Sequence, residues 1–129
     1  MFKYFFTVFL LCIIPLSVSV KAADYAYFGF EPDIVTNYVS SKKSMGFVRL
    51  TVELMVADGS NVSVIEHHAP LLRDEIIRII GQQNESKIKS MKGRSEIQLL
   101  CEERVKELLT QETGEPIIKK LLFTQWLDN

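Results

Sequence analysis

The side chains most able to do chemistry are two adjacent histidines in the middle of the chain. His67 and His68 are the only histidines, and Glu66 precedes them. Neighbouring residues on a helix point about 100° apart, whereas zinc ligands on a helix are spaced three or four residues apart. The pair therefore predicts a polar helix surface rather than a metal site. We expect no metal and no other cofactor.

The sequence also lacks a recognisable set of catalytic residues. Nucleophilic catalysis needs a serine or cysteine beside a base and an orienting group, but the serines gather in turns and helix starts. No GxSxG motif or glycine-rich phosphate loop occurs. The acidic pairs Asp74–Glu75 and Glu102–Glu103 lie among arginines and lysines, which predicts solvated helix faces with weak ion pairs. We interpret Cys101 as a small buried hydrophobe and expect no enzymatic activity.

The first 22 residues differ in composition from the rest. Residues 4–20, YFFTVFLLCIIPLSVSV, carry no charge and follow Lys3. A basic end, an apolar middle and small residues before Ala22 are typical of a secretory signal peptide. The alternative is a short uncleaved membrane anchor, although a spanning helix needs about 20 apolar residues. Both interpretations place residues 23–129 outside the cytoplasm as one domain.

Charge argues against a nucleic-acid partner. The 129 residues carry a net charge of −1, and removal of Lys3 and Lys21 with the leader makes the remainder more acidic. Nucleic-acid binding usually needs a basic face, and no dense basic cluster is present. With no second cysteine outside the leader, Cys101 has no partner for an internal disulfide, so stability must come from core packing.

The elements that must position these residues are two helices and three strands. Alternating apolar residues predict a strand at 46–56, and β-branched residues predict another at 33–39. A helix is expected from a capping box at Ser63 to Gly81, a second helix from a cap at Ser90 to Gly114, and a last strand at 117–127. The order predicts an α+β fold, in which a small antiparallel or mixed sheet is packed by two helices on one face.

Spacing also predicts which residues face the core. Pro70 should kink or restart the first helix, and Gly81 should end it in a left-handed conformation. The expected apolar face of the first helix is Ile65, Ala69, Leu72, Ile76 and Ile79, that of the second is Ile97, Leu100, Cys101, Val105, Leu108 and Leu109, and that of the last strand is Ile117, Leu121, Phe123 and Leu127.

Two residues stand out as candidates for interaction or structure. Asn37 interrupts a β-branched run, where an amide is mildly unfavourable, so it either bonds across the sheet or faces a partner. Trp126 lies near the end of the last strand, as part of the core or as an exposed anchor. For both residues a structural role is the simpler interpretation.

Four stretches together resemble the FliL family of flagellar basal-body-associated proteins, over about residues 27–126. They are YFGFEPDIVTNYV, GFVRLTVELMV, HHAPLLRDEIIRIIG, and SMKGRSEIQLLCEERVKELL followed by IIKKLLFTQWL. The third carries Pro70 and Arg73, which match the family's helix and join Asn37 and Trp126 as candidate residues. Each stretch alone is weak evidence, but their order and spacing match.

The resemblance implies a domain with the stomatin-type (SPFH) fold in the periplasm, near the inner membrane. It implies a non-enzymatic role in supporting the flagellar motor and motility, with stator or basal-body proteins as partners and a ring of copies as one form of assembly. Unpaired sheet edges would be ready sites for such contacts. The alternative is a periplasmic small-molecule or peptide-binding module unrelated to the motor, which predicts an enclosed apolar pocket.

Overall fold

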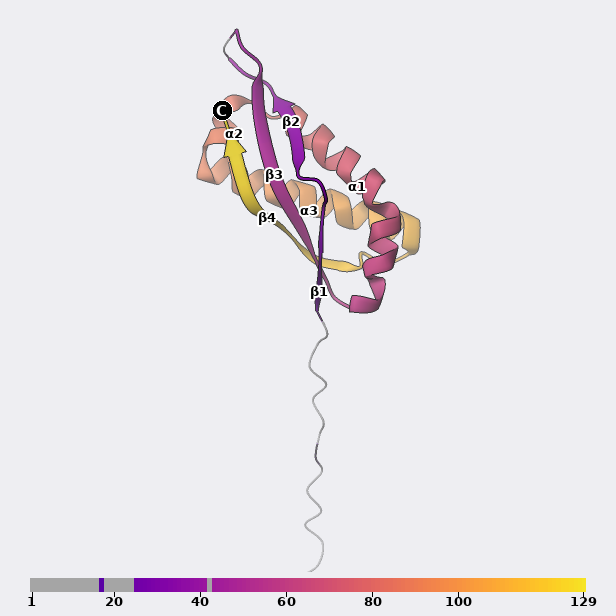
Figure 1. Cartoon of the computed structure of the whole chain (residues 1–129). Helices are drawn as coiled ribbons and strands as arrows, with labels where there is room; N and C mark the ends of the chain where they lie inside the picture. The colour runs from indigo at the N-terminus through magenta and orange to yellow at the C-terminus, as the bar shows by residue number, and fades with distance from the viewer. Residues whose placement is uncertain (1–16, 18–24, 42) are drawn as a thin grey trace, which may run out of the picture.

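One antiparallel sheet with helices on a single face forms the domain (Figure 1). The structure is a computed structural model and describes residue 17 and residues 25–41 and 43–129. The predicted leader lies almost entirely outside these residues. The α+β class and the placement of the helices on one side of the sheet are confirmed, and the sheet is antiparallel throughout.

The central strand is β3, Gly46–Val56, which pairs with every other strand. β4, Ile118–Asp128, lies along one edge of β3. β2, Ile34–Tyr38, and β1, Ala26–Gly29, follow one another along the other edge. The strands predicted at 33–39 and 46–56 are confirmed, but the expected total of three is wrong because β1 is a separate fourth strand.

The alternation of β3 gives the sheet one buried face. Its even-numbered apolar residues are fully buried against the helices, which removes apolar surface from water and stabilises the fold by about 25 cal/mol per Å². The buried residues of β3 are Val48, Leu50, Val52, Leu54 and Val56. From the first helix, Ile65, Leu72, Ile76 and Ile79 are buried as predicted, and Ala69 packs against them partly buried.

The first helix, α1, runs without interruption from Val62 to Gly81, so the predicted restart at Pro70 is wrong. A short 3-10 turn, η1 at Gly59–Asn61, leads into it, and Asn61 rather than Ser63 is its N-cap. Gly81 ends α1 without a positive φ, so its predicted left-handed conformation is wrong, and the C-cap Gln82 is right-handed as well. The left-handed C-cap is Gly114, with φ of 88°, at the end of the last helix.

Two further helices follow α1. α2, Glu85–Lys89, lies between the two predicted helices, where no helix is predicted. The Asn84 side chain caps it by accepting from Lys87 N at 3.0 Å. α3, Met91–Thr113, begins at the predicted cap, where Ser90 Oγ accepts from Gly93 N at 3.0 Å. The predicted apolar face of α3 is confirmed at Ile97, Cys101, Val105 and Leu109, with Leu108 partly buried, but Leu100 is 41% exposed.

Two irregularities shift the phase of β4. Its register against β3 changes between Thr51 and Val52 and again between Met55 and Val56, so β4 has one extra residue at each place. Leu121 and Phe123 face the core as predicted, and Ile117 is buried just before the strand begins. Leu127 is 52% exposed on the opposite face, so its predicted core position is wrong.

Candidate functional site

The four candidate residues lie in different places. Pro70 is exposed on α1. Arg73 donates from Nη2 to the Pro32 carbonyl at 2.7 Å and lies over the Phe30 ring, so it ties α1 to the segment before β2. Trp126 packs beside Phe123 and under Arg94, partly buried at the core. Asn37 alone lies on the open side of the sheet. The structure does not bring the four together.

The open side of the sheet, here called the outer face, carries the outward-pointing residues of all four strands. No described helix covers it (Figure 1). Several of its apolar side chains are strongly exposed. A group of exposed apolar residues on one surface is typical of a site that another molecule covers. The exposed apolar residues of the outer face are Tyr27, Val35, Phe47 and Leu127, and Val39 and Met45 are exposed just after β2 and just before β3. This surface is the candidate site for a protein contact.

One ion pair lies within the outer face. Arg49 Nε donates to Asp33 Oδ2 at 2.9 Å, and Thr51 Oγ1 donates to Asp33 Oδ1 at 3.0 Å. These hydrogen bonds, the one from Arg49 first, hold the pKa of Asp33 below its ordinary value. Arg49 itself remains largely exposed, so its remaining donors are open to a partner.

The sheet edges are less open than the sequence suggested. On β4, Leu121 N donates to Glu102 Oε1 at 2.9 Å, and Gln98 Nε2 donates to the Leu121 carbonyl at 2.9 Å. Beyond the end of β2, Val39 N donates to the Gln83 carbonyl at 2.9 Å. Because α3 and the segment after α1 occupy these edge groups, strand addition at these points would first have to displace them.

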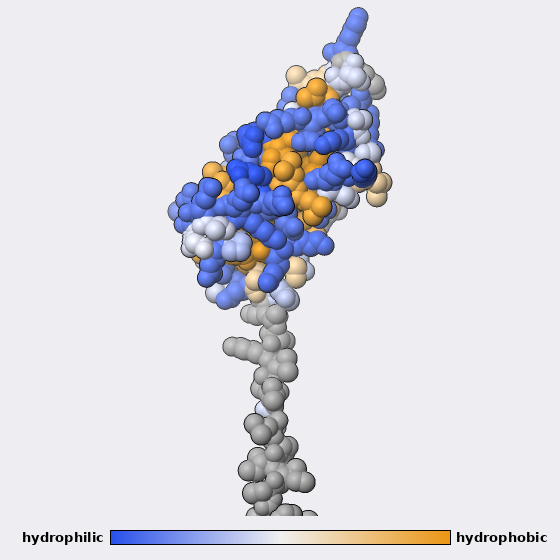
Figure 2. All heavy atoms as spheres, turned by 180° about the vertical axis from the view of Figure 1, so that it is seen from behind, coloured by the Kyte–Doolittle hydropathy of each residue, from blue (hydrophilic) through white to orange (hydrophobic). Residues whose placement is uncertain are grey.

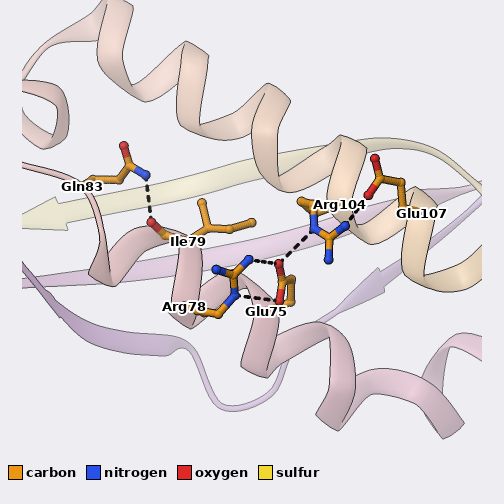
Figure 3. Close-up of polar contacts among 6 residues, drawn as sticks. All are labelled: Glu75, Arg78, Ile79, Gln83, Arg104 and Glu107. Carbon is orange, nitrogen blue, oxygen red and sulfur yellow. Dashed lines mark hydrogen bonds and ion pairs between the residues drawn. The ribbon is translucent and has the colours of Figure 1, made fainter.

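A four-residue ion cluster joins α1 to α3 on the helical side (Figure 3). Arg78 binds both carboxylate oxygens of Glu75, at 2.5 and 3.0 Å, and Arg104 Nε reaches Glu75 Oε1 at 3.0 Å. Arg104 also pairs with Glu107. The Glu75 side chain is only 12% exposed, so the predicted solvated face is wrong at this position.

The cluster controls the ionisation of Glu75. The hydrogen bond from Arg78 has the largest effect, and the bond from Arg104 adds to it, so the pKa of Glu75 falls to about 2 despite the opposing effect of burial. A carboxylate with so low a pKa stays charged at neutral pH and is a poor proton donor or acceptor. The cluster is therefore a link between helices rather than a catalytic group.

The two histidines and Cys101, whose side chains could do chemistry, are packed against their neighbours. His68 Nδ1 lies 2.8 Å from the Val64 carbonyl, and the His67 and His68 rings meet edge to face. Within residues 25–41 and 43–129, no group of three or more metal-ligating side chains occurs. Cys101 is buried, as predicted, and burial raises the pKa of its thiol to about 12.

We expect Cys101 to resist alkylation in the native protein. A thiol reacts as the thiolate. Burial raises the pKa of Cys101, so little thiolate forms at neutral pH, and burial also keeps the reagent away from the sulfur. Iodoacetamide at pH 8, followed by peptide mapping, should leave Cys101 unmodified until urea unfolds the chain. Rapid native labelling at Cys101 would contradict the buried position; the peptide map separates this signal from that of Cys12.

A hollow of about 430 Å³ lies between the end of β2 and α2. Its charged groups already pair with neighbours, since Glu85 accepts from Ser41 Oγ at 2.5 Å and lies 3.4 Å from Lys89 Nζ. It is lined by Val39, Ser40, Ser41, Asn84, Glu85, Ser86 and Lys89. We assign no ligand to this hollow, which is not the enclosed apolar pocket expected of a small-molecule binding module.

The helical side carries apolar surface of its own. Figure 2, seen from behind, shows apolar residues gathered at its centre and framed by hydrophilic ones. On the helices, the strongly exposed apolar side chains are Leu71, Met91, Leu99 and Leu100. None of the helices in the described part of the chain is both long and apolar enough to cross a membrane.

Comparison with known proteins matches this domain to one family. The family model described as flagellar basal body-associated protein FliL matches residues 27–127. The flagellar protein FliL of Aquifex aeolicus (strain VF5) is 24% identical over 97 residues, which cover 75% of this chain and 57% of that protein. The match therefore spans somewhat more than half of the relative. Because the family model covers most of the chain, the protein belongs to the FliL family of flagellar basal body-associated proteins.

Proposed function

We propose that this protein is a non-enzymatic component of the flagellar basal body that supports the stator units, and so motility, through protein contacts in the periplasm. The observation that carries the proposal is the family match over residues 27–127, which takes in nearly the whole described domain. The sequence of residues 1–22 supports a location in the periplasm, because it has the pattern of an export signal. Residues 1–22 would export the chain as a signal peptide or hold it at the inner membrane, with residues 23–129 as a stomatin-type domain.

The distribution of polar groups supports a contact role rather than a chemical one. Glu75, Arg104 and Glu102 join elements of the fold, and Cys101 is buried. By contrast, the outer face leaves several large apolar side chains in water. Exposed apolar surface of this kind is typical of sites where proteins meet, as a scaffold around the stator would require, whether the copies act singly or in a ring.

Deletion of the gene in its own organism tests the motor role. We expect cells that still assemble filaments but spread more slowly in soft agar, because the stator would lose support while the filament would remain. Electron microscopy of filaments separates a motor defect from an assembly defect. Deletion cells that spread at the normal rate would contradict the proposal.

Complementation sharpens the test of location. The full chain should restore spreading, as should a chain whose residues 1–22 are replaced by another export signal if the leader acts only in export. A chain without residues 1–22 should fail to restore it, because the domain would remain in the cytoplasm. Co-purification of stator proteins with the restored chain tests the partner separately.

A further inference from the structure

The outward residues of β3 are arranged so that two antiparallel copies of the strand would place opposite charges, and apolar side chains, opposite each other. Along the strand, Phe47, Arg49, Thr51, Glu53 and Met55 all point to the outer face, because side chains alternate across a strand and the intervening residues are buried. In chemical terms the order is apolar, positive, polar, negative, apolar. Read from Thr51 in either direction, an apolar residue lies at the same distance, and opposite charges occupy equivalent positions.

The neighbouring strand β4 extends this symmetry on one side of β3. On β4, Leu127 pairs with Arg49 and Leu122 pairs with Glu53, while Gln125 pairs with Thr51 itself. A two-fold axis perpendicular to the strands through Thr51 and Gln125 would place each copy's β4 over the other's β4. Leu127 of one copy would then meet Leu122 of the other.

From this pattern we propose that the outer face binds the outer face of a second copy of this chain, with the two β3 strands antiparallel. Arg49 of each copy faces Glu53 of the other, and Phe47 of each faces Met55 of the other. The two ion pairs lie roughly 7 Å on either side of the axis, because a strand rises about 3.4 Å per residue. A crossing angle of about 30° between the sheets displaces the paired side chains by only about 3–4 Å.

The size of the face fits a reversible dimer. Eleven residues of β3 at about 3.4 Å each, and three strand positions about 4.8 Å apart, give a face of roughly 500 Å² per copy. About 1,000 Å² in total lies at the lower limit of specific interfaces. Contacts of α3 and the segment after α1 with β4 and β2 leave the outer face more accessible than the edges.

Cross-linking of the full chain in intact cells tests the dimer. A Gln125→Cys variant, in a Cys12→Ser background, places a thiol on the proposed axis, and Cys101 is buried. A short bismaleimide should span the two thiols, because facing sheets pack about 10 Å apart. Ser95→Cys on α3 is the matched control, exposed on the helical side of the domain. We expect a product of two copies from Gln125→Cys and none from Ser95→Cys.

Charge reversal tests the register. In the Gln125→Cys chain, Arg49→Glu or Glu53→Arg should each reduce the linked fraction about tenfold, because like charges then face each other twice. The double variant should restore linking. Asp33→Asn removes the internal partner of Arg49 and should leave linking intact, which separates loss of that ion pair from loss of the dimer.

Several outcomes would overturn the inference: equal linking from Ser95→Cys, a product whose mass is not that of two copies, or a double variant as poor as the single ones. The inference does not depend on the motor role. A dimer found in cells that spread normally after the gene is deleted would remove the proposed function and leave the dimer. Loss of linking in cells that require the gene for spreading would remove the dimer and leave the proposed function.

Discussion

Replacing Gly93 by alanine is expected to destabilise the domain by about 2–4 kcal/mol, because the new methyl group has no room. Gly93 is buried in the first turn of α3, where the chain folds back on α2. A Cβ at this position would lie 2.6 Å from Lys87 Cα and 2.7 Å from Lys87 C, and closer still to the Lys87 carbonyl oxygen. These are backbone atoms, so relief requires α2 to move away from α3. Urea unfolding of the full chain, followed by circular dichroism, measures the change.

Gly81→Ala is the matched control, because Gly81 also lies in a helix. A Cβ there would meet nothing closer than the Asn37 carbonyl at 3.8 Å, which is ordinary contact. Alanine also lowers the conformational entropy of the unfolded chain, so we expect no loss of stability and a gain of up to about 1 kcal/mol. If the free energy of unfolding of Gly93→Ala lies within about 0.5 kcal/mol of the wild-type value, the close approach of α2 and α3 is wrong.

The parts of the fold that could be predicted are those whose burial repeats along the chain. β3 alternates over its whole length and was located to the residue, and the stripe of α1 was identified because each of its residues faces the same core. β1 and α2 were missed since four and five residues are too short to establish a period. The local cost of Pro70 predicts a kink or a restart, but α1 continues through this residue because its apolar face packs on the core along its whole length.

Other errors came from contacts between segments far apart in the chain. The phase of β4 depends on two irregularities against β3, which no local pattern in residues 118–128 marks, and so Leu127 was placed on the wrong face. The charged neighbours of Glu75 in the sequence predict a solvated position. Its burial depends on Arg104, which only the packing of α3 on α1 brings within 3.0 Å.

Of the candidate residues, only Asn37 lies on the outer face, and the surface itself was missed. The signal lies in the residues between the buried positions of β3, from Phe47 to Met55, which alternation alone predicts only as the side away from the core. Their order carries information that burial does not, because charge and apolarity on an exposed strand can be arranged to suit a partner. A strand should therefore be read on both of its faces.

Glu75→Gln is expected to lower the free energy of unfolding by about 1–2 kcal/mol at pH 7. The variant keeps the size of the side chain but removes the charge that holds Arg78 and Arg104. The full shift of the pKa of Glu75 from 4.5 to about 2 would correspond to a larger loss of stability. The expected loss is smaller because both arginines are about a third or more exposed, and solvent weakens the ion pairs. Urea unfolding of the wild type and the variant at pH 7 measures the difference.

The pH dependence of that difference identifies its origin. The folded protein holds the pKa of Glu75 below the unfolded value of 4.5, so the charged carboxylate stabilises the fold fully above pH 4.5. This stabilisation falls as the pH drops from 4.5 towards 2, where Glu75 becomes protonated in the folded state as well. The gap between wild type and Glu75→Gln should therefore be largest at pH 6–7 and shrink steadily by pH 3. Glu103→Gln, on the exposed side of α3, should show no gap at either pH. A gap for Glu75→Gln that stays constant with pH would mean that the charge of Glu75 does not link the two helices.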